Sequence, residues 1–164
     1  MRKFLAITSC CLLVTALPAA EYPKMGEDIY DTQADAQVQI DAALQTAAQA
    51  NQHVLLMFGA NWCIWCHRLH ETMISDQSVA AALKRDYIVV MVDVNTRNDT
   101  KRNADVNARY GNPIQFGLPV LVVLDADGQQ LTTQETGALE EGDGHSPAKV
   151  VAFLEKWAPA KGGN

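Results

Sequence analysis

The sequence predicts an α/β fold with a mixed central sheet and helices on both faces of that sheet. Short, near-continuous apolar runs, typical of strands covered on both sides, alternate along the chain with longer segments whose apolar residues recur at helical spacing. The length of 164 residues, with 48% apolar and 20% charged content, suits one globular domain with an ordinary core.

The first half of the chain is predicted to contain a helix, a strand and two further helices. Residues 34–50 are rich in Ala and Gln and carry an approximate apolar stripe, which predicts a helix that ends at Asn51. The apolar run 53–58 is the pattern of a central strand. Beyond the cysteines an apolar residue recurs at helical spacing until Ser75-Asp76, which is typical of a break that caps a further helix over 79–84.

The second half is predicted to contain three strands and two helices. Residues 87–94 form another apolar strand, and the polar stretch 95–110 has a weak helical pattern that ends at Gly111. The strand at 120–124 and its return strand at 130–133 are joined by an Asp-Gly turn, because Asp-Gly supplies the positive φ that hairpin turns require. Ser146-Pro147 pairs an N-cap with a first-turn proline and begins a closing amphipathic helix.

The N-terminus is typical of a secretory signal peptide. Arg2 and Lys3 supply the positive end, Phe4 to Leu17 is apolar and almost uncharged, and Pro18-Ala19-Ala20 offers small residues for cleavage. We therefore expect an exported protein, periplasmic if the source is a Gram-negative bacterium. The predicted parts are a signal peptide at 1–20, an N-terminal extension at 21–33 that runs over the surface, a domain at 34–158 and a tail at 159–164.

Lipid anchoring is the alternative form of export. Ile7-Thr8-Ser9-Cys10 resembles a bacterial lipoprotein cleavage box, in which the cysteine is lipidated. The apolar run before Cys10 is short for a signal core, so soluble export ranks first.

Cleavage after residue 20 changes the charge and the cysteine count. The segment carries two basic residues and no acidic one, so the net charge moves from −6 to −8, which argues against nucleic acid and anionic membrane as partners. No membrane span is expected in the mature protein. Cys10 and Cys11 are removed with the leader, which leaves Cys63 and Cys66 as its cysteines.

These two cysteines lie in the stretch Gly59-Ala60-Asn61-Trp62-Cys63-Ile64-Trp65-Cys66-His67, between a predicted strand and a predicted helix. Two thiols at this spacing are placed for redox chemistry or for metal or haem attachment. They cannot close a large loop, so a purely structural disulfide framework is disfavoured.

Two motifs and the order of elements resemble the thioredoxin superfamily. Phe58 to Cys66 matches its Trp-Cys-x-x-Cys motif, and Gly117-Leu118-Pro119-Val120 matches its cis-proline loop. The resemblance covers roughly residues 34–157 and implies a thioredoxin-like fold. The signal peptide and the form of the motif are most similar to exported bacterial members, including the thioredoxin-like C-terminal domain of the membrane reductant carrier DsbD.

The resemblance implies a thiol-disulfide oxidoreductase that uses a redox-active Cys63–Cys66 disulfide and no other cofactor. A helix start favours the Cys63 thiolate, so Cys63 is the expected nucleophile and Cys66 the thiol that resolves the mixed disulfide. Protein thiols or disulfides are the implied substrates, with a membrane reductant carrier as a further partner.

Substrate contacts also follow from the resemblance. Pro119 would be cis, and the Leu118 backbone would pair with an extended peptide. Trp62, Ile64 and Trp65 would form an exposed apolar rim. Two departures leave the direction of electron flow open: Met57 stands where thioredoxin has a buried aspartate, and Ile64-Trp65 replaces its Gly-Pro.

Alternative functions remain for the same residues. Cys63-x-x-Cys66-His67 matches the c-type haem attachment motif, and Cys63, Cys66, His67 and His70 share one helical side, as in a metal site. Both rank behind redox chemistry, because a cytochrome does not need this strand-helix context and one helix face rarely completes a tetrahedral shell. His67 or His70 could instead tune the Cys63 thiolate. A thioredoxin-like binding or chaperone module without turnover is the competing class.

Overall fold

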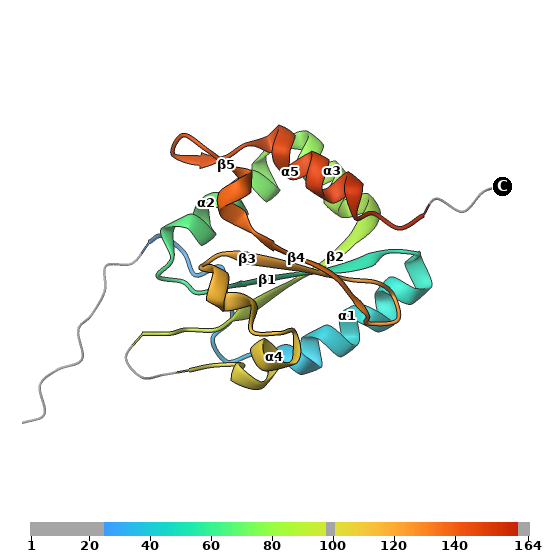
Figure 1. Ribbon diagram of the computed structural model, residues 1–164, viewed down its shortest axis with the longest axis horizontal. Coiled ribbons are helices and arrows are strands. Elements are labelled where there is room, and N and C mark those ends of the chain that lie inside the picture. Colours follow the sequence, from blue (N-terminus) through green and yellow to red (C-terminus); the bar gives the residue numbers. More distant parts are fainter. Residues whose placement is uncertain (1–24, 98–100, 161–164) are drawn as a thin grey trace, which may run out of the picture.

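A mixed sheet lies between two layers of helices in the computed structural model, which describes residues 25–97 and 101–160 (Figure 1). The strands, in the spatial order β2-β1-β3-β4, are β2 Tyr87–Asp93, β1 His53–Gly59, β3 Val120–Leu124 and β4 Gln130–Glu135. β1 runs parallel to β2 and antiparallel to β3, and β3 runs antiparallel to β4. The fold class predicted from the sequence is confirmed.

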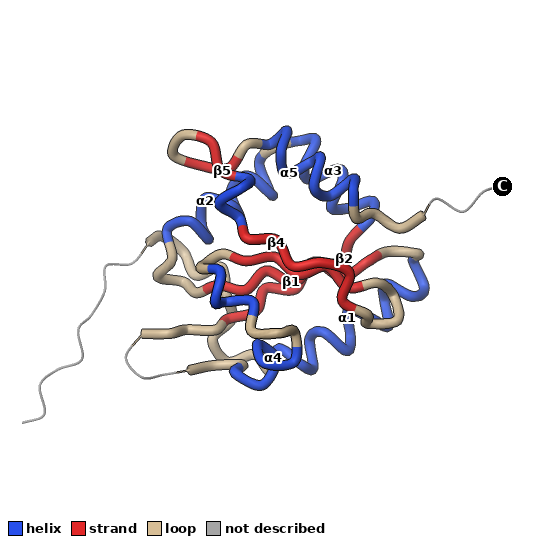
Figure 2. Tube along the Cα trace, in the orientation of Figure 1, coloured by secondary structure: helices blue, strands red, loops and turns tan. Residues whose placement is uncertain are grey.

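The helices separate into two groups by the face that they cover (Figures 1 and 2). One face carries α1 Ala36–Ala50 and α4 Ala104–Arg109. The other carries α2 Ile64–Ser75, α3 Gln77–Asp86 and α5 Pro147–Lys156. In the residues that the structure describes, no helix is both long and apolar enough to span a membrane. The predicted signal peptide at 1–20 lies outside the described residues.

The central strand β1 divides the core into two clusters, because successive side chains on a strand point to opposite faces. Val54, Leu56 and Phe58 pack with α1 and α4. Leu55 and Met57 belong to the cluster that contains α2, α3 and α5. Every residue of β1 after His53 is buried, so the continuous apolar run reflects helices on both sides.

Local signals fix several element ends: those at Asn51 and Asp76 were predicted, whereas the cap at Asp35 was not, and α1 starts two residues after the predicted residue 34. The Asp35 carboxylate accepts hydrogen bonds from the Gln37 and Val38 N–H groups at the start of α1, and Asn51 ends that helix in the left-handed conformation. Asp76 separates α2 from α3 and caps the second of them. That helix starts at Gln77, two residues before the predicted start.

Four short elements were not predicted. They are two 3-10 helices and a hairpin of two-residue strands: η1 Pro113–Phe116, η2 Thr136–Leu139, β5 Glu140–Glu141 and β6 Gly144–His145. Elements of this length carry too few residues to show a hydrophobic period.

The prediction that the N-terminal extension runs over the surface is wrong at Ile29 and Tyr30. Tyr30 is only 2% exposed and belongs to the core cluster that contains Cys66, and Ile29 packs against it. The Asn61 side chain anchors this segment by accepting hydrogen bonds from the Ile29 and Tyr30 N–H groups. The polar composition of this segment gave no signal that one aromatic residue is buried. The position of residue 34 as a domain boundary stays a prediction.

Candidate functional site

The two cysteines lie where β1 ends and α2 begins, and their sulfurs form a disulfide. Their Cα atoms are 5.2 Å apart. Cys66 is fully buried in the core cluster beneath α2, whereas Cys63 is 5% exposed. The disulfide therefore presents one sulfur toward the surface and keeps the other inside the protein.

Cys63 is the N-cap of α2, one position before the first helical turn in which it was predicted. Its backbone is extended, with φ −90°, and its Sγ accepts a hydrogen bond from the Cys66 N–H at 3.2 Å. The first N–H groups of a helix lack intrahelical partners and carry the positive end of its dipole. Both effects favour negative charge on the Cys63 sulfur over the neutral thiol.

The loop before β3 faces the cysteines across a groove. The peptide bond between Leu118 and Pro119 is cis, and Gly117 has φ +98°, a conformation that side chains disfavour. Leu118 and Gly117 line a groove of about 450 Å³ together with Cys63 and Ile64. Thr136 donates its hydroxyl to the Pro119 carbonyl at 2.7 Å, which ties this loop to the segment after β4.

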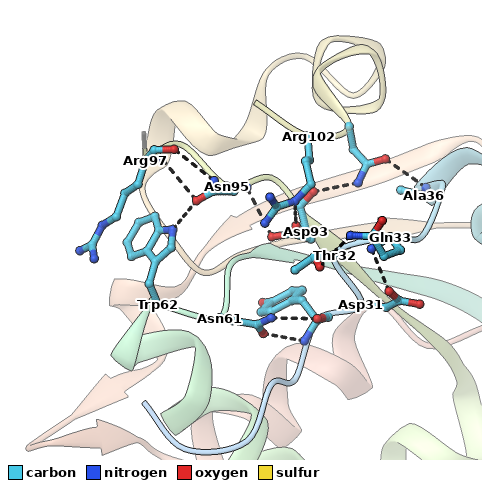
Figure 3. Close-up of polar contacts among 12 residues, drawn as sticks. Asp31, Thr32, Gln33, Ala36, Asn61, Trp62, Asp93, Asn95, Arg97 and Arg102 are labelled. Carbon is cyan, nitrogen blue, oxygen red and sulfur yellow. Dashed lines mark hydrogen bonds and ion pairs between the residues drawn. The ribbon is translucent and has the colours of Figure 1, made fainter. Parts of the chain in front are cut away.

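Trp62 is half-buried, less exposed than predicted, and it lines the groove together with Ile64 and Trp65. It is held in place on two sides. Its Nε1–H donates to Asn95 Oδ1 at 2.7 Å, and the Arg97 guanidinium carbon lies 3.8 Å from the ring centre (Figure 3). The Asn95 Nδ2 group in turn donates to the Arg97 carbonyl at 3.1 Å. This network fixes one wall of the groove.

Trp65 is also half-buried, which leaves Ile64 as the exposed member of the predicted rim, at 40%. The Arg68 guanidinium carbon lies 4.5 Å from the Trp65 ring centre. The His145 ring meets Trp65 edge to face at 5.8 Å between centroids. The β5–β6 hairpin thus supports the other end of the cysteine stretch.

His67 and His70 lie away from the groove. His67 Nε2–H donates to the Asn61 carbonyl at 2.9 Å. Burial lowers the pKa of His70, and the positive charge of His67 lowers it further. Both rings line a second cavity of about 590 Å³, and neither Cys63 nor Cys66 is among the described residues around it. Their tuning of the Cys63 thiolate stays a prediction.

The metal alternative gains no support from the arrangement. Within residues 25–97 and 101–160, no group of three His, Cys, Asp or Glu side chains is placed to hold a metal ion.

Sequence reasoning missed four residues that support the site, namely Tyr30, Asn61, Asn95 and Arg97. Asn61 joins the motif to the N-terminal segment: its Oδ1 accepts from two backbone N–H groups, and its Nδ2 donates to the Tyr30 carbonyl at 2.9 Å. An amide side chain beside the cysteines was the only local signal. The partners of the Asn61 side chain lie more than thirty residues away in the chain, so the tertiary structure had to reveal them.

Comparisons with known proteins agree on one family. A family model described as a thioredoxin-like domain matches residues 40–143. The disulfide bond reductase DsbH of Chlamydia pneumoniae is 28% identical over 162 residues, which cover 92% of this chain and 90% of that protein. The thiol:disulfide interchange protein DsbD of Ralstonia nicotianae is 30% identical over 99 residues, 60% of this chain but 15% of the relative's length.

A solved structure extends the comparison to three dimensions. The disulphide isomerase of Xylella fastidiosa Temecula1 superposes with a TM-score of 0.68 at 34% sequence identity. The match covers 78% of this chain and 95% of the other.

Proposed function

Because the chain belongs to the thioredoxin-like domain family and is a thiol-disulfide oxidoreductase by class, we propose that it exchanges disulfides with protein or peptide thiols through Cys63 and Cys66. The observation that carries the proposal is the Cys63–Cys66 disulfide at the N-terminus of α2, with Cys63 on the wall of a surface groove.

Cys63 is the attacking sulfur in this proposal. In the reduced protein the Cys63 thiolate attacks a substrate disulfide, forms a mixed disulfide and releases one substrate thiolate. The unpaired N–H groups at the start of α2 stabilise the thiolate before the attack. Exposure supports the assignment, since Cys63 borders the groove and Cys66 is fully buried.

Cys66 resolves the mixed disulfide. Its thiolate attacks Cys63 Sγ, the second substrate sulfur leaves, and the Cys63–Cys66 disulfide forms again. The protein loses two electrons to the substrate disulfide, and the same steps in reverse oxidise a substrate dithiol. The disulfide is thus the redox group, without a further cofactor.

The groove supports an extended peptide as the substrate. Leu118 lines the groove together with Cys63 and would offer backbone groups to the peptide, as in recognition by strand addition. Ile64 supplies exposed apolar area, and the fixed ring of Trp62 offers a flat surface beside it. Pro119 follows Leu118, and its carbonyl accepts the hydrogen bond from Thr136 that ties this loop to the segment after β4.

Location and partner belong to the proposal as well. The basic, apolar and small-residue pattern of residues 1–20 supports export, with the periplasm as the compartment in a Gram-negative source. Similarity to part of a DsbD protein favours a membrane-bound thiol-disulfide partner.

Single serine substitutions test the chemistry. We expect Cys63→Ser to abolish exchange with glutathione disulfide, and Cys66→Ser to accumulate a stable mixed disulfide at Cys63 that intact-mass measurement detects. Circular dichroism of both variants controls for folding. Exchange by Cys63→Ser at the wild-type rate would reject the enzymatic proposal and favour a binding module.

A further inference from the structure

Tyr30 carries a buried hydroxyl that the steps above do not use. The side chain is 2% exposed, and its oxygen finds no hydrogen-bond partner in the described part of the chain. Buried hydroxyls are almost always paired, because leaving water without a new partner is costly. In the oxidised protein the Tyr30 O–H group is therefore a donor for which the described residues offer no acceptor.

This hydroxyl lies beside the sulfur of Cys66. A Cβ atom built on Gly59 would overlap the Tyr30 oxygen and lie 2.6 Å from Cys66 Sγ, so both atoms border the same small space above Gly59. Tyr30 and Cys66 also belong to one core cluster. The absence of a side chain at Gly59 is what lets the hydroxyl approach the sulfur.

Hydrogen bonds from the Asn61 side chain hold the Tyr30 backbone in the position that brings its hydroxyl close to Cys66 Sγ. Asn61 Oδ1 accepts from the Tyr30 N–H at 2.8 Å, and Asn61 Nδ2 donates to the Tyr30 carbonyl at 2.9 Å. Asn61 lies two residues before Cys63, so the cysteine motif itself positions the tyrosine.

Burial and the neighbouring negative charge both keep the Tyr30 hydroxyl protonated. Burial raises the pKa of Tyr30, and the negative charge of Asp93 raises it further. Asp93 lies opposite Gly59 on β2 and forms an ion pair with Arg102. Among the neighbouring histidines, His67 donates a hydrogen bond to the Asn61 carbonyl, and the His145 ring packs edge to face against Trp65. Tyr30 can therefore donate a proton in a hydrogen bond but does not act as a base.

We propose that the Tyr30 hydroxyl donates a hydrogen bond to the Cys66 thiolate when the disulfide is open, and so accelerates the resolution of the mixed disulfide. A sulfur in a disulfide is a weak acceptor, whereas a thiolate is a strong, charged one. Tyr30 thus gains its partner only in the state that attacks. The inference rests on the proposed function and adds a hydrogen-bond donor to it.

The proton and electron balance of this step is complete. The Cys66 thiol releases its proton to water, and the thiolate forms while Tyr30 keeps its own proton. The Cys66–Cys63 bond then forms as the bond between Cys63 and the substrate sulfur breaks. The released substrate thiolate takes up a proton from water.

A stopped-flow experiment separates the two steps. Reduced full-length protein is mixed with dithiobis-nitrobenzoate, whose thiolate is yellow: attack by Cys63 releases one equivalent, and resolution by Cys66 releases a second. The first phase depends on reagent concentration and the second does not. We expect Tyr30→Phe to leave the first phase unchanged and to slow the second about tenfold at neutral pH, the effect of one hydrogen bond to a charged group.

The pH profile adds a measurement that a merely structural role would not change. We expect the midpoint of the second phase in Tyr30→Phe to lie about one pH unit higher, because the thiolate loses its donor. Tyr110→Phe, the same change in the other core cluster, should leave both phases as in the wild type.

A second variant keeps the hydroxyl but loosens its anchor. Asn61→Ala removes the side chain that holds the Tyr30 backbone, and it should also slow the second phase selectively. The role of Tyr30 would be overturned if the second phase of Tyr30→Phe kept the wild-type rate and pH midpoint. Equal slowing of both phases would overturn it as well. A wild-type protein without a second phase would instead reject the proposed function.

Discussion

Gly59 shows how one residue determines the packing around the disulfide. It ends β1, and a side chain there would meet the Tyr30 ring and Cys66 Sγ at once. Both neighbours are buried, so neither can move into solvent.

At the residue scale, we predict that Gly59→Ala destabilises the protein. Overpacking a closed core costs about 1–3 kcal/mol of unfolding free energy, which urea denaturation measures. Gly144→Ala is the matched control, because a Cβ there meets no described atom within 4 Å. Equal unfolding midpoints for the two variants would contradict the packing described around Gly59.

The β5–β6 hairpin is the element that supports α2 from outside the sheet. Its His145 is 6% exposed, and neither ring nitrogen has a partner among the described residues. Burial lowers the pKa of His145, and the positive charge of Arg68 lowers it further. The folded protein therefore binds a proton at this ring less readily than the unfolded chain does.

At the element scale, this pKa shift makes docking of the hairpin depend on pH. The stability that neutral His145 contributes is fully present above the pKa of a histidine in the unfolded chain, about 6.5. It is lost as the pH falls toward the lower pKa of His145 in the folded protein. We predict that His145→Phe, which keeps an aromatic ring against Trp65, reduces the fall in melting temperature between about pH 7 and pH 5. His70, whose pKa is also lowered, should account for part of the remainder. An unchanged pH profile in His145→Phe would count against this assignment.

The whole molecule includes the segment before α1 in its core. Tyr30 belongs to the core cluster beneath α2, and the chain then enters α1 on the other face of the sheet, where Asn103 Oδ1 accepts from the N–H of Ala36, the first residue of that helix, at 3.1 Å. The segment before α1 thus contributes a side chain to one face of the sheet and leads into the helix on the other face.

At the molecular scale, we predict that a chain starting at residue 34 is less stable than one starting at residue 27. The shorter chain lacks Ile29 and Tyr30, and loss of a buried aromatic side chain costs about 3–5 kcal/mol. Thermal unfolding of both chains, each without the leader, makes the comparison. Coincident transitions would mean that residue 34 is a true domain boundary.

Several features could be read from the sequence because their signals are local. The apolar runs, the Asp76 cap and the Asp-Gly turn predicted the elements that form the sheet and its two layers. The spacing of Cys63 and Cys66 at a strand-helix junction predicted a reactive site there, and the resemblance to the thioredoxin superfamily implied the disulfide between them.

The tertiary structure decided what surrounds the cysteines, because those contacts join residues far apart in the chain. It buried Tyr30, an aromatic residue in a polar segment, and it fixed the half-buried Trp62 ring through a hydrogen bond to Asn95. A sequence pattern reports whether a residue favours water or the interior and at what period. It does not report which distant hydroxyl or amide closes on a given sulfur, since that follows only when the sheet brings the segments together.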